Sequence, residues 1–435
     1  MQGSLDTPHI SSENIPMKVL ILSINYWPEV TGIGAFTISR AEYLAAAGHE
    51  VEVCTTFPYY PEWKVTAQYA GKFAATEERN GVRIIRSYAY IPTRVTSLKR
   101  VLHEASFIAT SLLRALGRKR PDVLLVVSPP LGLAVSAILL GWLWRIPYVF
   151  DVEDLQPDSA ADLGMLPPLV LKLMYRVEAA AYRYAALVST ITDGMRERIL
   201  KKGVPPEKVT LFEARLDSSL LDLAPEEGTA FRQRYDLGDK FLVTHSGNMG
   251  VKQGLDVIVD AAVLGRADGS TQFLLVGSGV DRERIQNRVA DLGLENVRFF
   301  PLLDEADFRG LLAATNICLV TQQKAASDIF FPSKMVTYLA AGRPLIASVD
   351  SGSQAARVTR ESGAGRTVVP EDPGALLRAV HEMRTEDLRA YGAKARDYAI
   401  SKWAPARVLG YLEQTLASVA FMPAKGQTEE GAIRR

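Results

Sequence analysis

Short apolar runs alternate with longer helical patterns along almost the whole chain, and this alternation constrains the fold more than any other feature. The first series begins with KVLILSI at Lys18 and VEVCT at Val51, and continues through VRIIR, VLLVV, PYVFD, LVSTI and KVTLF, which starts at Lys208. Strands that are buried on both faces of a parallel sheet have this pattern, because helices cover the sheet on each side. Residues 17–216 are therefore predicted to form one doubly wound α/β domain.

The pattern starts again in the second half of the chain. Its runs are FLVTHS at Phe241, FLLV, VRFF, ICLV and finally LIAS at Leu345, with helical segments between them. Residues 217–239 are polar and contain Pro and Gly, which favours a hinge between two domains. We predict an α/β protein of two Rossmann-like domains, the second over 240–395, that face a central cleft at the C-terminal ends of their strands.

The two ends of the chain lack this alternation. Residues 1–16 contain no apolar stretch of the signal-peptide type and are expected to form a flexible leader. Residues 396–420 have helical periodicity and are expected to form a helix that packs back toward the N-terminal domain. The tail, residues 421–435, has no apolar periodicity and is expected to be disordered.

Composition excludes several classes of protein. The 435 residues include 50 Lys and Arg and 49 Asp and Glu, so a formal net charge of +1 provides no global field that would attract nucleic acid. Apolar residues make up 48% and charged residues 23%, as in ordinary soluble globular proteins. The two cysteines, Cys54 and Cys318, are too few for a disulfide framework or a cysteine metal cluster, which favours a reducing cytoplasm.

Turns that contain glycine follow three of the predicted strands. Gly32 and Gly34 follow the first strand, before a helix expected to begin near Thr37; SGNMGVKQG from Ser246 follows the first strand of the second series, and VGSG ends at Gly279. Such turns let backbone N–H groups approach a phosphate or a sugar, and a simple tight turn is the alternative for Gly32 and Gly34. Lys252 in the second turn would suit a diphosphate, and a solvated surface lysine is the alternative.

The segment DIFFPSKMVTYLAAGRP, which ends at Pro344, is the most specific part of the chain. Ser333 is expected to cap a helix that carries Lys334 in its first turn, where the helix dipole disfavours a cation. An anion held between the helix N-terminus and the Lys334 ammonium would explain this placement. A lysine side chain that reaches solvent is the alternative.

An acidic cluster begins at the C-terminal end of the predicted strand PYVFD. It places Asp151, Glu153, Asp154 and Asp158 near the expected cleft, where carboxylates can hold sugar hydroxyls or act as a base. No histidine or second acidic strand end supports a divalent metal, so no metal site is predicted. A helix-entry loop with favourable N-terminal charges is the alternative.

Six motifs, taken in order, resemble those of the retaining glycosyltransferases of family 4, which have the GT-B fold. The motifs are VLILSINYWPEVTGIGAF, GHEVEVCT, FDVEDLQPDSA, HSGNMGVKQGLDVIVDA, FLLVGSG and FPSKMVTYLAAGRPLIA, and the resemblance covers nearly all of residues 17–420. The residues of these motifs are similar to those of the family branch that builds exopolysaccharides, capsules and O-antigens. The resemblance implies a nucleotide-diphosphate sugar as co-substrate and no cofactor. It also implies that the departing phosphate helps to deprotonate the acceptor, so that no enzymatic nucleophile is needed.

The resemblance also implies roles for individual residues. Asp151 and Asp154 would face the transferred sugar, and Lys252 and Lys334 would meet the diphosphate. The remaining donor-binding residues would be Gly247, Asn248, Gln253, Gly277, Gly279, Ser333 and Thr337. On the acceptor side we expect Gly32 and Gly34, together with the aromatic loop residues Tyr59, Tyr60 and Trp63, which could stack on sugars or simply form a rigid loop between prolines.

Three positions depart from the residues that are usual in this family. Thr337 stands where a ribose-binding glutamate is common, Gln253 where a lysine is common, and Ala214 where an asparagine is usual. Altered donor contacts or a degenerate site would explain Ala214. Two alternatives to transfer stay open: a non-catalytic nucleotide-sugar-binding subunit, and a GT-B nucleotide-sugar epimerase.

Residues 94–120 point to a membrane surface. Apolar residues recur there at helical spacing from Leu98 to Leu116, and seven basic residues against the single acid Glu104 give a local formal charge of +6. Trp142 and Trp144 would extend this surface to the level of the lipid headgroups. We therefore expect a polyprenyl-diphosphate-linked or oligosaccharide acceptor and a cytoplasmic protein held peripherally at the inner face of the cell membrane. A helix that buries its apolar stripe in the domain core is the alternative.

The most apolar segment, residues 123–144, is long enough to cross a bilayer. Pro129 and Pro130 interrupt it, however, and a membrane-spanning helix rarely begins with such a break. The segment is therefore predicted to form a buried strand followed by a helix.

Overall fold

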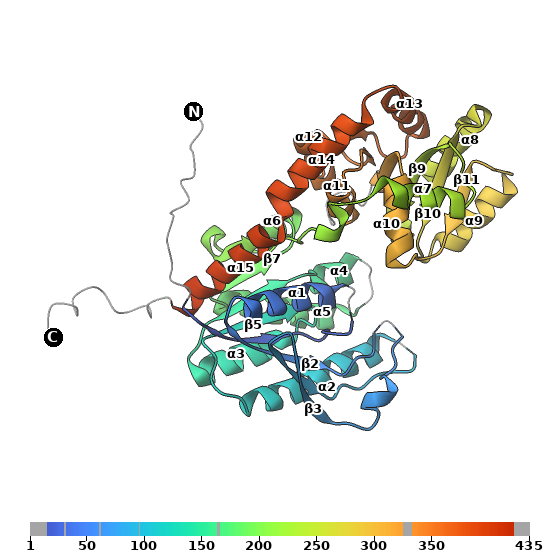
Figure 1. The fold of residues 1–435 in the computed structure, drawn as a ribbon. Helices are drawn as coiled ribbons and strands as arrows, with labels where there is room; N and C mark the ends of the chain where they lie inside the picture. The colour runs from blue at the N-terminus through green and yellow to red at the C-terminus, as the bar shows by residue number, and fades with distance from the viewer. Residues whose placement is uncertain are drawn as a thin grey trace. The chain divides into compact units, whose positions relative to one another are not determined.

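The computed structural model describes residues 15–29, 32–60, 62–94, 96–162, 166–324 and 333–421. These residues form two compact units, each built on its own β-sheet with helices around it (Figure 1). Described residues within 1–191, 199–212 and from 411 onward belong to the first unit, and those within 192–198 and 213–410 belong to the second. The predicted pair of α/β domains is confirmed.

The first unit contains an eight-stranded sheet in the order β3-β4-β2-β1-β5-β6-β7-β8. Neighbouring strands are parallel, except that β3 runs antiparallel to β4. The strands are β1 (Lys18–Leu22), β2 (Glu50–Thr56), β3 (Ala74–Arg79), β4 (Val82–Ser87), β5 (Val123–Ser128), β6 (Tyr148–Val152), β7 (Leu187–Thr190) and β8 (Val209–Leu211). The α-helices between them are α1 (Ile33–Ala46), α2 (Ser97–Leu116), α3 (Leu133–Trp144), α4 (Gln156–Asp162), α5 (Pro168–Tyr184) and α6 (Asp193–Lys201).

The second unit contains a six-stranded parallel sheet in the order β11-β10-β9-β12-β13-β14. Its strands are β9 (Phe241–Ser246), β10 (Thr271–Val276), β11 (Val297–Phe300), β12 (Ile317–Thr321), β13 (Leu345–Ser348) and β14 (Gly365–Val368). The α-helices of this half are α7 (Pro225–Arg234), α8 (Asp256–Leu264), α9 (Arg282–Asp291), α10 (Glu305–Ala314), α11 (Lys334–Ala340), α12 (Gln354–Ser362), α13 (Pro373–Arg384), α14 (Leu388–Trp403) and α15 (Pro405–Ala420).

All the strands predicted from the sequence are present, and the two that the sequence analysis missed, β3 and β14, both lie at sheet edges. β3 reads AATEER and is partly exposed along its whole length, and β14 reads GRTV. An edge strand has one neighbour and is not buried on both sides, so it needs no continuous apolar run. The pattern that identifies central strands therefore gives no signal for these two.

Helix α1 begins at Ile33, four residues before the predicted start near Thr37. Gly32 stands at its N-cap with a φ of 55°, a conformation that glycine adopts without strain. At Gly34 a Cβ atom would lie 2.2 Å from the carbonyl oxygen of Glu29. Both glycines are thus explained by the tight entry into the helix, where the chain passes close to itself.

The predicted hinge, residues 217–239, is part of the second unit and is not an extended connector. It contains α7, whose Phe231 is buried with Leu242, Leu274 and Leu311 in one apolar cluster. The stretch looks polar in sequence because only one side of α7 is covered.

The end of the chain forms two helices where one was predicted. Pro405 has no backbone N–H group and starts α15 directly after α14 has ended. From Tyr411 onward α15 belongs to the first unit, where Leu412, Leu416 and Val419 are buried in the same cluster as residues of α1 and β1 (Figure 1). Residues 1–14 and 422–435, on which the leader and tail predictions fall, lie outside the described residues.

The apolar segment 123–144 forms β5 and α3, as predicted. β5 is buried at every position. In the described ranges no helix combines the length and the hydropathy that a membrane crossing requires.

The packing of α15 predicts that Leu416→Ala destabilises the protein by about 2–5 kcal/mol, because it removes a fully buried side chain and leaves a cavity. Thermal or urea unfolding measures the effect. Gln414→Ala, an exposed position on the same helix, is the control and should leave the unfolding midpoint nearly unchanged. Equal midpoints for the two variants would contradict the packing.

Candidate functional site

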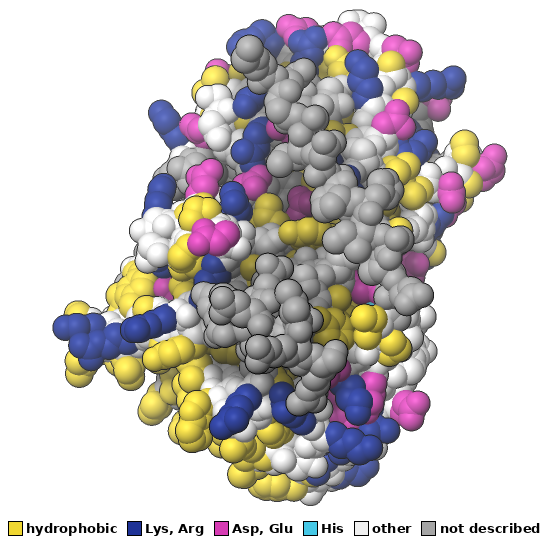
Figure 2. Space-filling view, turned by 90° about the vertical axis from the view of Figure 1, so that its left-hand side faces the viewer, with side chains coloured by type: hydrophobic (Ala, Val, Ile, Leu, Met, Phe, Trp, Pro, Cys, Tyr) yellow, Lys and Arg dark blue, Asp and Glu magenta, His cyan; other side chains and the backbone are white. Residues whose placement is uncertain are grey.

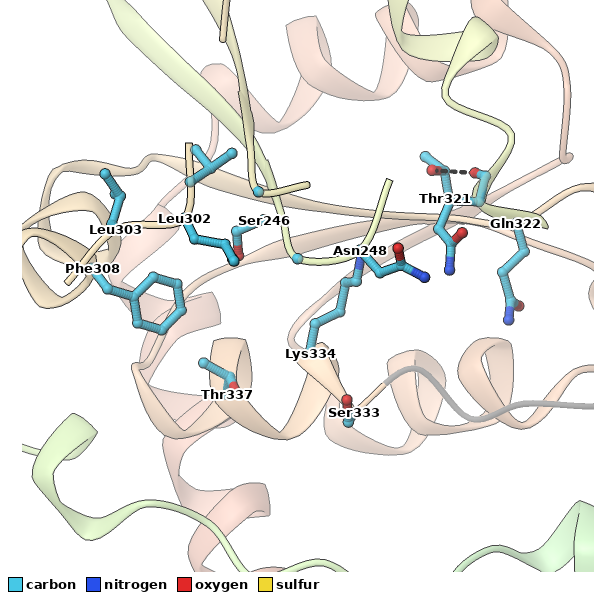
Figure 3. A pocket seen from close by; sticks show the side chains of 14 residues that line it. Ser246, Asn248, Leu302, Leu303, Phe308, Thr321, Gln322, Ser333, Lys334 and Thr337 are labelled. Atoms are coloured by element: carbon cyan, nitrogen blue, oxygen red, sulfur yellow. Dashed lines mark hydrogen bonds between the residues drawn. The ribbon is translucent and has the colours of Figure 1, made fainter. Parts of the chain in front are cut away.

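A cavity of about 550 Å³ lies in the second unit, at the C-terminal ends of β9, β10 and β12 (Figure 3). This is the edge of a parallel sheet where ligands bind in doubly wound folds. Seven of the predicted donor-site residues line it, namely Gly247, Asn248, Gln253, Gly277, Ser333, Lys334 and Thr337. The sequence analysis did not single out the others, which are Ser246, Val276, Leu302, Leu303, Phe308, Thr321 and Gln322.

The glycine turns after β9 and β10 line one part of the cavity. Their backbones pack directly against each other. The Gly247 N–H donates to the carbonyl of Val276 (2.9 Å), and the Met249 N–H donates to that of Ser278 (2.8 Å). A Cβ atom on Gly277 would lie 2.0 Å from the carbonyl oxygen of Gly247. Residues with side chains do not fit at this distance, so glycine is required for the turns after β9 and β10 to meet.

Lys334 begins α11 and points toward the turn after β9. Its Nζ atom lies 3.1 Å from Nε2 of His245, and a Cβ atom on Gly247 would be 3.7 Å from the same amine. Burial lowers the pKa of Lys334 to about 7. Burial, and next the Lys334 charge, also hold the pKa of His245 well below its usual value, so this ring is neutral. The amine is therefore poised to gain a proton when an anion enters the cavity.

Tyr338, one turn further along α11, ties this helix to β9. Its buried hydroxyl accepts a hydrogen bond from the Ser246 N–H (2.8 Å) and donates to the Ser246 carbonyl (3.2 Å). Tyr338 thus anchors to β9 the helix that carries Lys334.

The cavity has a polar end and an apolar end. In Figure 3, Leu302, Leu303 and Phe308 lie on one side, Asn248 and Gln322 lie on the other, and Lys334 stands between them. A ligand with an apolar ring at one end and charged or hydroxyl-bearing groups at the other would match this division.

One expectation for this half of the site is wrong, and two of its predicted residues are not among the described lining residues of the cavity. Ser333 has helical backbone angles and makes no capping hydrogen bond within the described part of the chain, since a capping side chain requires an extended backbone. Lys252 is exposed in a short 3-10 turn (Val251–Gln253) and is not among the described lining residues. Gly279 is also not among them, and a Cβ atom there would lie 2.4 Å from the carbonyl of Met249.

In the first unit, the prediction that Asp151 faces a sugar does not agree with the structure. Asp151 is fully buried at the end of β6, where it accepts hydrogen bonds from Arg40 Nη1 (2.5 Å) and Ser189 Oγ (2.8 Å). The same Arg40 atom donates to Glu153 (2.9 Å). A buried carboxylate must be paired or hydrogen-bonded, so Asp151 holds β6 to α1 and is not available to a substrate.

Asp154 and Asp158, near the start of α4, are both engaged by other side chains. Asp154 accepts a hydrogen bond from the Ser159 hydroxyl (2.9 Å), and Asp158 accepts one from the Tyr175 hydroxyl (2.9 Å) and pairs with Lys202. The Asp154 contact is that of a helix-entry loop, the alternative that the sequence left open, whereas Asp158 links α4 to α5 and to Lys202.

The aromatic loop of the predicted acceptor side is held by a buried carboxylate. Glu29 accepts hydrogen bonds from the backbone N–H groups of Tyr59 (2.7 Å) and Tyr60 (2.6 Å). The Tyr59 ring is buried and packs between Trp63 and His103, with its hydroxyl 3.0 Å from His103 Nε2. Tyr60, by contrast, exposes 44% of its surface. Of these two tyrosines, Tyr60 is thus the one that offers a ring to a ligand.

Sequence reasoning missed the residues that hold the predicted ones in place, namely Glu29, Arg40, His245 and Tyr338. His245 could have been noticed in the sequence, because it is a titratable residue within a strand that is predicted to be buried. The others resemble ordinary helix or loop residues until their partners are known. In the ranges described above, no group of three or more His, Cys, Asp and Glu side chains is arranged to hold a metal ion.

The burial of Glu153 predicts how the free energy of unfolding depends on pH. Burial, opposed by Arg40, raises the pKa of Glu153 to about 8, so the folded protein keeps a proton that the unfolded chain releases above the ordinary glutamate pKa. The free energy of unfolding should therefore fall as the pH rises from about 5 to about 8. Glu153→Gln mimics the protonated form and should make this dependence weaker, whereas the exposed control Glu62→Gln should leave it unchanged. Parallel pH profiles for Glu153→Gln and the wild type in thermal unfolding would refute the assignment.

Comparisons with known proteins agree with this geometry. Residues 31–214 match the family described as "Glycosyl transferase 4-like domain", and residues 240–386 match "Glycosyl transferases group 1". WcaI of Escherichia coli K12, a glycosyl transferase assigned to colanic acid biosynthesis, is 32% identical over 392 residues, which are 88% of this chain and 95% of WcaI. A GDP-mannose-dependent alpha-mannosyltransferase of Mycobacterium tuberculosis is 25% identical over 67% of this chain and 70% of its own length.

Among solved structures, HepE (Alr3699) from Anabaena in complex with UDP is 18% identical, with a TM-score of 0.68 over 92% of this chain and 100% of HepE. This likeness extends the agreement in fold to both units. The two matched families together span most of the described residues, and the chain therefore belongs to the family 4-like glycosyltransferases with the GT-B fold.

Proposed function

We propose that the protein is a retaining glycosyltransferase of surface polysaccharide biosynthesis. It transfers a sugar from a nucleotide-diphosphate donor, bound in the cavity of the second unit, to a lipid-linked oligosaccharide acceptor bound by the first. The observation that carries the proposal is the cavity itself, in which Lys334 lies beside two glycine turns at the ends of parallel strands. The relatives assigned to colanic acid biosynthesis and to transfer from GDP-mannose support the reaction class.

The cavity suits a nucleotide diphosphate in size and in chemistry. Its volume falls within the range of roughly 300–1,000 Å³ that is typical of small-ligand sites. Leu302, Leu303 and Phe308 provide an apolar end for a base, and Lys334 provides the cation for a diphosphate. HepE, which has the same fold, was solved with UDP.

In the proposed reaction Lys334 stabilises charge on the leaving group. The bond between the sugar and the diphosphate breaks as the acceptor oxygen attacks, and the negative charge that develops on the diphosphate is neutralised by the Lys334 ammonium. The departing phosphate takes the proton of the acceptor hydroxyl. This mechanism requires no carboxylate nucleophile, and the burial of Asp151 against Arg40 is compatible with it.

Lys334→Ala is expected to reduce transfer at least a hundredfold, because the diphosphate loses its buried cation, and to leave the fold intact. Transfer is measured with radiolabelled donor sugars and a lipid extract as acceptor. Beforehand, a panel of UDP-, GDP- and dTDP-sugars is screened for protection against thermal unfolding, which identifies the donor.

Lys394→Ala, an exposed lysine on α14, is the matched control and should retain full transfer. Full activity of Lys334→Ala would refute the role of this amine. A wild-type protein that binds a nucleotide sugar but transfers nothing to any acceptor would favour the non-catalytic subunit.

Support for a membrane-bound acceptor comes from α2, whose apolar stripe faces outward. His103, Phe107, Ser111 and Ala115 are the buried positions of this helix. The exposed positions on the opposite side carry large apolar residues, namely Leu98, Val101, Leu102, Leu113 and Leu116. A water-exposed helix normally has the reverse arrangement, so this face is suited to an apolar surrounding.

The outward apolar face continues over two further helices of the same unit. α2 contacts α3, and α3 contacts α5. Val135, Leu139, Trp142 and Leu143 of α3 are exposed, as are Leu169, Val170 and Leu173 of α5. Figure 2 shows hydrophobic side chains gathered in the lower part of the view, among Lys and Arg side chains. We call the outward residues of α2, α3 and α5 the apolar face.

Basic residues border the apolar face, although several are already engaged within the protein. Arg118 donates two hydrogen bonds to Glu52, and Arg100 pairs with Glu104. Trp142 is 80% exposed, whereas Trp144 is half-buried. The apolar side chains therefore contribute more to the proposed membrane contact than the charge of +6 suggested.

The double variant Leu102→Glu with Trp142→Glu is expected to lose most of its binding to vesicles of phosphatidylglycerol and phosphatidylethanolamine. Each carboxylate would have to be buried against lipid, which is unfavourable. Co-sedimentation measures the bound fraction. Val369→Glu, at an exposed apolar position of the second unit, is the control. If the double variant and the control sediment alike, the apolar face is not the contact.

A further inference from the structure

His245 lies within hydrogen-bond distance of the Lys334 amine. It is in β9, one residue before the end of the strand, and it is fully buried. Its Nε2 atom is 3.1 Å from Lys334 Nζ, and the two residues are 89 positions apart in the chain. A buried titratable side chain is costly unless it has a specific partner, and here the partner is the cation of the cavity.

The surroundings favour a neutral His245 ring, which can accept a hydrogen bond from the amine. Its ring is neutral because burial and the Lys334 charge both oppose a second proton. Of the other titratable groups near the pair, Cys318 of β12 is a buried thiol whose pKa is raised to about 12, and the Tyr338 hydroxyl is bonded to Ser246. Both are neutral near pH 7, and in the tautomer that carries its proton on Nδ1, His245 presents the Nε2 lone pair to the amine.

We propose that His245 is a positioning residue, which accepts one hydrogen bond from the Lys334 ammonium and directs its two remaining N–H groups at the diphosphate of the donor. The inference rests on the proposed function, because it takes the ligand of this cavity to be a nucleoside diphosphate. A lysine on a flexible four-carbon chain has many rotamers, and an acceptor at its base limits them before the ligand arrives.

The contact between His245 and Lys334 should affect both the proton uptake on binding and the affinity for the ligand. The pKa of Lys334 is about 7, so above this pH the amine is largely neutral and must take up a proton when the diphosphate binds. The affinity for a nucleoside diphosphate should therefore fall as the pH rises above 7. Without the His245 acceptor the ammonium is less stable, and this fall should begin at a lower pH.

Isothermal titration calorimetry with UDP, GDP and dTDP tests the proposal. His245→Phe, which removes the acceptor and keeps a ring of similar size, is expected to weaken the tightest of these ligands about tenfold. His245→Gln can place its amide oxygen near the same point and should recover most of the loss. Titrations in buffers of different ionisation enthalpy give the number of protons taken up, and His381→Phe on the surface helix α13 is the control.

A double-mutant cycle separates positioning of Lys334 from a general effect on the fold. If His245 acts through the amine, His245→Phe should have no further effect on affinity in a Lys334→Met background. An equal loss in both backgrounds, or a wild-type affinity and pH profile in His245→Phe, would overturn the proposal. If the wild type binds none of the three nucleotides, the proposed function fails and the inference fails with it.

Discussion

The cavity of the second unit depends on the direct packing of two backbone turns. Gly277 meets the carbonyl of Gly247 at a distance that excludes any side chain, and the turn after β9 is thereby held against the turn after β10. This contact leaves space above the strand ends, into which Lys334 projects from α11. Gly277 is thus required for the packing of the two turns, and this packing shapes the cavity.

Buried polar groups hold both units in the geometry that their sites need. In the first unit Arg40 joins Asp151 and Glu153, and Glu29 holds the aromatic loop through two backbone N–H groups. In the second, Tyr338 ties α11 to β9, and His245 meets the Lys334 amine. Each of these contacts joins residues that lie far apart in the sequence. The residues that position a site are therefore as informative as those that line it.

The apolar face of the first unit reverses the usual arrangement of a surface helix. The inward side of α2 carries His103 and Ser111, and its outward side carries Leu98 and Leu102. Hydrophobic periodicity alone shows that a helix has two sides, but it does not show which one is buried, because the period is the same in either case. The sequence left both orientations open for this reason, and the tertiary structure selects the outward one.

The order of the strands and helices could be read from the sequence, because hydrophobic periodicity and glycine turns are local properties that short windows contain. The motifs likewise singled out Lys334 and the two glycine turns, which the structure brings to one cavity. Edge strands, the pairing of Asp151 with Arg40 and the contact of His245 with Lys334 could not be read in this way. The paired residues are 111 and 89 positions apart, and only the three-dimensional packing of the sheets decides that they meet. Long-range contacts therefore determined which predicted residues are free to bind a ligand and which are occupied in holding the fold.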